Sequence, residues 1–351
     1  MATYTSFTAE ETKAIADRFW LPRMICPPAG GIGCYLIAFP WPSDNAFVVL
    51  FWTLFEAYAL FFWTSCFHET AHQTLTSFKW FNVALGRILG TAMYVPYTVY
   101  RESHIRHHAN LNKPNDWELW PYADPTSPLW FRRIFVWFDL LLGVYGSPIV
   151  YGRIYFHRDS PIKSPAIRRR IRNEYFAIVI FWVIAFSVIT YSGAWWGFFK
   201  IWWIPTAIAG ICQTVRKLTE HLGMSSYDPM LGTRTVLGTN WMTRLGTFIN
   251  FDLFIHGPHH RHPRVSHNLL KHKMLSYIQE NPDKEFPVYT TYFRAILAMI
   301  PFLFGNPGCG MNAGARYPGK PKNEDVQDFV ADVAEEVIAS NDLVVSTGSY
   351  T

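Results

Sequence analysis

Residues 101–108 read RESHIRHH, and two further histidine clusters match this stretch: HETAH at residues 68–72 and HGPHH at residues 256–260. Eight of the 13 histidines lie in these three clusters. Residues three and four apart share one face of a helix, so each cluster can direct two or three imidazoles towards one point. Imidazole suits iron, zinc, copper and nickel, and eight nitrogens exceed the four ligands of a tetrahedral zinc site. The sequence therefore predicts two metal ions of higher coordination number, with these candidate ligands: His68, His72, His104, His107, His108, His256, His259 and His260.

The composition indicates an all-α integral membrane protein. Of the 351 residues, 50% are hydrophobic and only 16% are charged, against about 25% charged in an ordinary soluble domain. The 15 Trp and 18 Tyr residues suit a chain with two membrane interfaces. The five cysteines are scattered without a CxxC motif, which argues against a disulfide framework or a cysteine metal site. Residues 1–18 are polar with charges of both signs, so they do not resemble a cleaved signal peptide.

Hydrophobic stretches predict four transmembrane helices arranged as two hairpins. The expected spans are Met24–Ser43, Ala46–Phe67, Tyr175–Thr190 and Trp195–Val215. The second span contains Glu56, which is either a functional group or a protonated carboxyl bonded to a neighbouring helix.

The rest of the chain divides into interfacial helices, a cap and two ends. Interfacial or half-buried helices are expected at Phe81–Tyr100, Leu129–Tyr151 and Phe286–Phe304. Residues 68–173 and 216–285 then form a cytosolic helical cap that holds the histidine-rich di-metal site. The predicted membrane domain covers residues 24–304, between a cytosolic lead-in (1–23) and a soluble tail (305–351).

The distribution of basic residues predicts the orientation. With four spans, 30 of the 31 Lys and Arg residues fall on one side of the membrane, and Lys200 is the exception. Such a bias marks the cytoplasmic side, so both termini and all three clusters are expected there in a multi-pass protein. Three spans would instead place the third cluster across the bilayer from the other two.

Acidic residues near the clusters are candidates for orienting the imidazoles, because a metal-bound histidine usually donates its other N–H to a carboxylate or carbonyl. These acids, each of which is also compatible with an ordinary surface position, are Glu69, Glu102, Asp116, Glu220 and Asp252.

The order of the clusters, HxxxH, HxxHH and HxxHH, resembles the membrane-bound fatty acid desaturase family, whose relatives include hydroxylases and carotenoid ketolases. Tyr100 and Arg101 before the second cluster, followed by Asn110, Asn112 and Asp116, resemble the family's aromatic-Arg-x-x-His-x-x-His-His-x-x-x-Asn stretch. The segment 259–263, HHRHP, resembles its His-His-x-x-Pro ending. The resemblance covers roughly residues 25–270.

The resemblance implies a di-iron centre that uses dioxygen to remove hydrogen from an unactivated C–H bond of a lipid acyl chain. It carries the ligand role to the eight clustered histidines and to His221, the further histidine that members often have before the last cluster. His262 exceeds the family pattern, and Pro258 suggests that the third cluster lies at a helix start or turn. The histidines outside the pattern, His157, His267 and His272, are expected at the surface.

The sequence lacks a cytochrome-b5-like HPGG motif and iron–sulfur cysteines, so a separate electron-donor protein of cytochrome b5 or ferredoxin type is expected. The basic segments 167–172 and 132–133 could dock such a donor or an anionic head group, but anchoring against anionic lipid is the preferred interpretation. The expected partners are a lipid acyl substrate, the donor and the membrane, with no nucleic acid.

Three functions remain open at this point. The preferred one is an oxygen-dependent fatty acyl desaturase, and the alternative is a lipid or terpenoid hydroxylase, ketolase or epoxygenase with the same irons. A zinc-dependent membrane hydrolase or metal transporter is a more distant alternative. A transporter should carry acidic and histidine residues inside several spans, whereas the predicted spans contain only Glu56.

Overall fold

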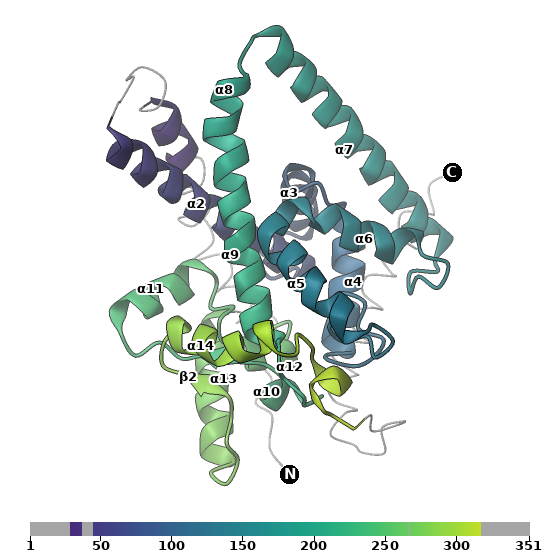
Figure 1. Cartoon of the computed structure of the whole chain (residues 1–351), viewed down its shortest axis with the longest axis vertical. Helices are drawn as coiled ribbons and strands as arrows, with labels where there is room; N and C mark the ends of the chain where they lie inside the picture. Colours follow the sequence, from purple (N-terminus) through teal and green to yellow (C-terminus); the bar gives the residue numbers. More distant parts are fainter. Residues whose placement is uncertain (1–28, 37–44, 266, 317–351) are drawn as a thin grey trace.

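A computed structural model describes residues 29–36, 45–265 and 267–316 of the protein. These residues are mostly helical, as predicted, and long helices occupy the upper part of the molecule in Figure 1. Shorter helices gather in the lower part, with one pair of parallel two-residue strands, β1 (Thr235–Val236) and β2 (Val288–Tyr289). The predicted lead-in at 1–23 and residues 317–351 of the predicted tail lie outside the described residues.

Two long apolar helices, α2 (Ala46–His72) and α7 (Pro165–Tyr191), contain 27 residues each. Both begin at a polar cap: the Asn45 side chain accepts from Phe47 N–H, and Ser164 accepts from Ile167 N–H. By length and composition, these two helices of the described part can cross a membrane. The count becomes three if the bent pair of residues 129–145 and 147–156 is treated as one span.

A third long helical stretch runs from residue 195 to residue 221 beside α2 (Figure 1). It comprises α8 (Trp195–Phe198), the π-helical turn η2 (Phe199–Trp203) and α9 (Ile204–His221). Pro205 lies in the first turn of α9, and a proline removes a helical hydrogen bond and clashes with the carbonyl one turn earlier. The π-helical turn therefore lies where the regular hydrogen-bond pattern has to change.

The four-span topology stays a prediction. The expected span Met24–Ser43 lies largely outside the described residues, and only its residues 29–36 are described, as a helix. Glu56 of α2 is buried and faces this short helix, because its carboxyl lies beside Gly30 and Gly31.

The expected interfacial helices are shorter than predicted, and two of them are broken. The first is divided into α3 (Lys79–Ala92) and α4 (Tyr97–Ala109), because Pro96 and the left-handed Tyr94 (φ 61°) separate them. The third begins only at α14 (Tyr292–Phe304), since β2 occupies part of the expected range.

The second expected interfacial helix bends by 98° between α5 (Leu129–Leu142) with η1 (Gly143–Tyr145) and α6 (Ser147–Phe156). Gly143 has φ +51°, a conformation that favours glycine. A Cβ at this position would lie 2.4 Å from the backbone carbon of Gly210 in α9. The bend therefore depends on a direct glycine–glycine contact between η1 and α9.

The remaining short elements follow α9 and surround its end. They are α10 (Pro229–Gly232), α11 (Trp241–Ile249), α12 (His256–Arg261), α13 (His267–Glu280) and η3 (Gly310–Ala313). The β1–β2 pairing joins the start of this region to the segment before α14, with Thr235 opposite Val288.

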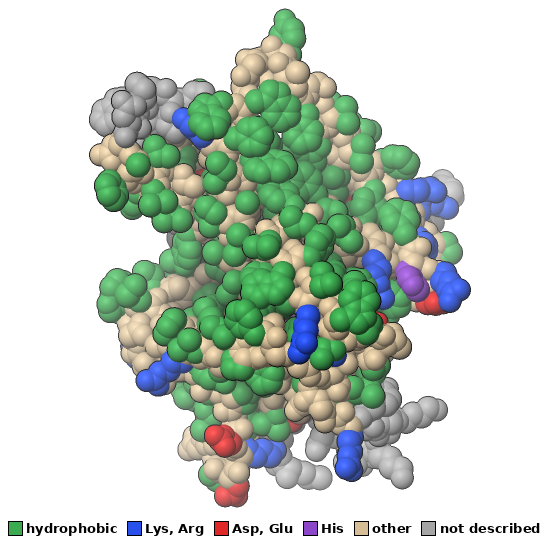
Figure 2. Space-filling view, in the orientation of Figure 1, with side chains coloured by type: hydrophobic (Ala, Val, Ile, Leu, Met, Phe, Trp, Pro, Cys, Tyr) green, Lys and Arg blue, Asp and Glu red, His purple; other side chains and the backbone are tan. Residues whose placement is uncertain are grey.

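The surface separates apolar from charged regions (Figure 2). Hydrophobic side chains cover much of the upper half, over α7, α8 and α9, and most charged side chains lie lower or at the side. Only 11% of the apolar window of α7 is buried within the protein, and its exposed side chains include Phe176, Ile180 and Ile184. Apolar exposure on this scale fits contact with lipid rather than water.

Candidate metal centre

Four helices bring the predicted ligands together. His68 and His72 lie in the last turns of α2, His221 ends α9, and the second and third clusters lie on α4 and α12. All nine histidines are between 0 and 5% exposed. The third cluster begins α12 at His256, so Pro258 occupies the first helical turn, where proline is tolerated.

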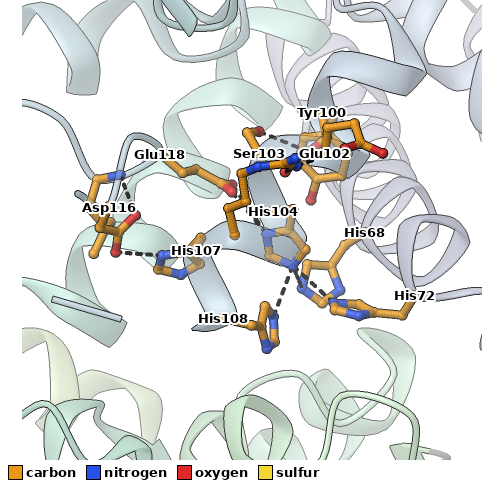
Figure 3. A network of polar contacts seen from close by, with 12 residues as sticks. His68, His72, Tyr100, Glu102, Ser103, His104, His107, His108, Asp116 and Glu118 are labelled. Atoms are coloured by element: carbon orange, nitrogen blue, oxygen red, sulfur yellow. Dashed lines mark hydrogen bonds and ion pairs between the residues drawn. The ribbon is translucent and has the colours of Figure 1, made fainter. Parts of the chain in front are cut away.

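The first imidazole group consists of five histidines whose ligand atoms lie within 4.8 Å of one another: His68, His72, His104, His108 and His259. His104 lies at its centre (Figure 3), and its Nε2 atom is 2.9 Å from Nε2 of His68, 3.0 Å from that of His72 and 3.2 Å from that of His108. The Nε2 atoms of His259 and His68 are 3.1 Å apart.

The second imidazole group consists of His107, His221, His256 and His260. Nε2 of His256 lies 2.9 Å from Nε2 of His221 and 3.0 Å from Nε2 of His260. His107 joins His221 and His260 within 4.8 Å, and Glu220 joins His221 and His256 at the same limit. The two groups are neighbours, because the rings of His108 and His260 stack with centroids 4.1 Å apart.

Hydrogen bonding alone does not account for the first group. Nε2 of His104 approaches three other Nε2 atoms, but one imidazole nitrogen carries at most one hydrogen. Its Nδ1 lies 3.1 Å from the Glu118 carboxylate, which favours the tautomer with hydrogen on Nδ1 and a lone pair on Nε2. Metal–nitrogen bonds of about 2.1 Å at right angles would place nitrogens about 3.0 Å apart. The donor set therefore fits a metal ion between the rings.

Three carboxylates contact the Nδ1 atoms of grouped histidines, on the side away from the clustered Nε2 atoms. Glu69 lies 3.2 Å from Nδ1 of His68, and Asp116 lies 2.8 Å from Nδ1 of His107 (Figure 3). Both acids were expected in this role. Glu118, which contacts Nδ1 of His104, is an addition to the prediction.

Two of the other candidate acids, Glu102 and Asp252, have different partners, whereas Glu220 lies 3.6 Å from Nε2 of His256. Glu102 forms an ion pair with Arg106 at 2.7 Å, and Asp252 lies 3.5 Å from His267. His267 is 3% exposed, so the expectation of a surface position was wrong: its ring is buried against Phe251 and Asp252.

Histidines outside the two groups follow the remaining expectations. His157 and His272 are exposed, as expected. His262 stays apart from both groups and lies 3.2 Å from the hydroxyl of Tyr277.

Burial and neighbouring charge set the protonation of the imidazoles. Burial lowers the pKa of His104 to about 4 against the opposing effect of Glu118. Burial and neighbouring histidines also lower the pKa of His108, His259 and His260 well below the ordinary value. For His107 burial opposes charge, but Asp116 outweighs it and the pKa is raised. Most of the imidazoles outside the apolar spans are therefore neutral at pH 7, the form that binds metal.

A cavity of about 130 Å³ opens beside both groups and is lined by residues of α2, α4, α6 and α9. His68, His104, His107, His221 and His256 line it. It adjoins a smaller apolar cavity through residues that line both, namely Thr64, Met93 and Val144. The smaller cavity, of about 20 Å³, lies between α2 and α9 and is lined further by Leu60, Trp63, Trp202 and Ala209.

Comparison with known sequences gives a family match. The profile of the family described as fatty acid desaturase matches residues 43–293, which is more than half of the chain and includes all nine grouped histidines. The protein belongs to the fatty acid desaturase family. This desaturase-family chain is 31% identical over 101 residues to a bifunctional fatty acid conjugase/Delta(12)-oleate desaturase of Punica granatum, covering 29% of this chain and 25% of that protein.

Two longer matches connect this desaturase-family protein with acyl-lipid enzymes. It is 24% identical over 266 residues to an sn-1 oleoyl-lipid 12-desaturase of Arthrospira platensis, covering 70% of this chain and 72% of the relative. It is 23% identical over 260 residues to an sn-1 acyl-lipid omega-3 desaturase (ferredoxin) of Synechocystis, covering 70% and 67%. Some relatives match over a shorter part of their length, such as a conjugase of Momordica charantia with 56% covered.

Proposed function

We propose that this protein is an oxygen-dependent di-iron desaturase that introduces a double bond into the acyl chain of a membrane lipid. The observation that carries the proposal is the position of two adjacent imidazole groups on one cavity, with a smaller apolar cavity next to it. The acyl-lipid desaturases among the relatives support a lipid-bound acyl chain as the substrate class.

The nine grouped histidines would hold two irons, and bound iron would supply the dioxygen chemistry that breaks an unactivated C–H bond. The protein's own residues orient the imidazoles and exclude water. Asp116 and Glu118 accept hydrogen bonds from Nδ1–H of His107 and His104 and so fix this tautomer. The Nε2 atom of each ring then keeps its lone pair to bind a metal ion. Leu60, Trp63 and Ala209 of the smaller cavity would contact the acyl chain farther from the reacting carbon and exclude water there.

Electrons would come from a separate protein of cytochrome b5 or ferredoxin type, and ferredoxin appears in the name of the Synechocystis relative. The proposed topology has four spans, with both termini and the imidazole groups on the cytoplasmic side. The excess of Lys and Arg on one side of that arrangement supports it.

Lipid profiling by mass spectrometry tests the activity. The chain is expressed in a host supplied with both donor types, beside His107→Ala and the matched control His272→Ala, whose histidine is exposed and outside both groups. We expect acyl chains two hydrogens lighter with the wild type and the control, and none with His107→Ala.

The same experiment separates the alternatives. A gain of one oxygen would favour a hydroxylase or epoxygenase, and a conjugated product would match the conjugases among the relatives. Identical lipids from wild type and His107→Ala would contradict the proposal. Metal analysis of purified protein adds a second criterion, because about two irons per chain are expected, whereas one zinc would support a hydrolase.

A further inference from the structure

Glu220, in the last turn of α9 directly before His221, belongs to the second imidazole group by its position. Its side chain lies in the interior, 4% exposed. Its Oε2 atom is 3.6 Å from Nε2 of His256, the nitrogen that faces the centre of the group. Its ligand atom and those of His221 and His256 lie within 4.8 Å of one another. The carboxylate is thus on the ligand side of the imidazoles, unlike Asp116, which contacts Nδ1 of His107.

The protein gives this carboxylate little compensation for its burial. Oε1 of Glu220 has no hydrogen-bond partner among the described residues. Arg216, one turn earlier on α9, donates to Ser65 Oγ at 2.7 Å. Its charge acts on Glu220 from a distance and offsets only part of the cost of burial, and no ion pair joins the two among the described contacts. Burying a carboxylate is costly unless it is paired or coordinates a metal. A cation in the second group would supply the missing partner.

The two groups also differ in their number of donors. The first group offers five imidazole nitrogens within 4.8 Å of one another. The second offers four, joined through the trio His107, His221 and His260 and through the 3.0 Å contact of His256 with His260. The acids next to the first group, Glu69 and Glu118, contact Nδ1 atoms and lie behind the rings. No carboxylate among the described residues joins the five nitrogens of the first group. With Glu220, each group has five donors, which leaves one position of an octahedral ion for another ligand.

We propose that Glu220 is an oxygen ligand of the second metal ion, so that one ion is held by five nitrogens and the other by four nitrogens and one carboxylate. The inference rests on the proposed di-iron function and adds a ligand to it. A negatively charged oxygen stabilises an ion of higher charge more than one of lower charge. The two irons are therefore chemically different, and the ion at Glu220 is the easier one to oxidise.

Mössbauer spectra and iron content of the purified full-length protein, loaded with ⁵⁷Fe and kept reduced, test this ligand. The variants are Glu220→Gln, Glu220→Asp and the matched control Glu102→Gln, whose carboxylate is equally buried but is paired with Arg106. We expect two doublets of equal area in the wild type and in Glu102→Gln. In Glu220→Gln one doublet should shift or disappear while the other keeps its parameters, and iron at that position should bind at least about tenfold more weakly.

The outcomes distinguish the ligand from the function. Two irons and two unchanged doublets in Glu220→Gln would overturn the inference that Glu220 is a ligand. The proposed function would still stand in that case, provided that the wild-type protein produces a double bond. A wild type that binds no iron would overturn both. If Glu220→Gln does not accumulate as folded protein, Glu220→Asp decides, because it keeps the charge and withdraws the carboxylate by one methylene. A shift confined to one doublet supports the ligand, and a spectrum identical to the wild type overturns it.

Discussion

The two imidazole groups use the same residue type at the same helical spacings, but their electrostatic surroundings differ. At the centre of the first group, His104 faces three other Nε2 atoms and its pKa is lowered to about 4 by burial. In the second group, burial also lowers the pKa of His260, but Asp116 outweighs burial at His107 and raises its pKa, and Glu220 adds a carboxylate near the grouped nitrogens. Helical spacing brings the nitrogens together, whereas acids outside the histidine clusters decide how much positive charge each group favours.

The strongest way to separate the groups is to remove the centre of the first one with His104→Ala. Three of the close Nε2 contacts involve this ring, so we expect bound iron to fall from about two to about one per chain. Desaturated product should fall by more than about 100-fold, beyond the effect typical of partners outside the ligand shell. Metal analysis and lipid profiling measure the two effects.

The control for this change is His262→Ala, because His262 lies outside both groups. It should keep about two irons and wild-type product. Retention of both irons by His104→Ala would show that the five nitrogens do not act as one ligand set.

A smaller change removes only the charge behind one ring in each group. Asp116→Asn and Glu118→Gln should weaken iron binding in the second and first group respectively by about 10–100-fold. The effect of Asp116→Asn should be the larger, because Asp116 is 2.8 Å from Nδ1 of His107 and Glu118 is 3.1 Å from that of His104. Chelator titration followed by Mössbauer spectroscopy measures the loss from each group, and equal loss from both groups in either variant would contradict the assignment.

Sequence spacing predicted eight of the nine grouped histidines because spacing within a cluster depends only on local helix geometry. The ninth, His221, stands alone in the sequence and was expected only from the resemblance to the family. Glu118 was missed because it lies ten residues beyond the second cluster, in the turns before α5, and reaches His104 only through the tertiary fold. Its position two residues after Asp116 was the available signal. Asp252 is the opposite case, an acid close in sequence to His256 that was a candidate to contact it. Its side chain instead lies beside His267.

The membrane helices were predictable to a similar degree. Apolar length identified α2 and α7, because burial in lipid requires an uninterrupted apolar run. The 98° bend at η1 was not foreseen from the sequence. It depends on the contact between Gly143 and Gly210, two residues far apart in the chain, and a single sequence does not show which glycines meet.

The mildest test of the comparison is acidification. Protons compete with metal for Nε2, and an ordinary histidine has a pKa of about 6.5. The pKa of His107 is raised above this value, so in the metal-free protein the charged pair with Asp116 is favoured at low pH and is lost as the pH rises through that pKa. His104, with a pKa of about 4, stays neutral until the pH is far lower. Iron should therefore leave the second group at a pH at least about one unit higher than the first. Iron content and the areas of the Mössbauer doublets, measured from pH 7.5 downwards, would follow the loss of iron from each group. If the first group released its iron before the second, or both released it together, the expected difference between the groups would be wrong.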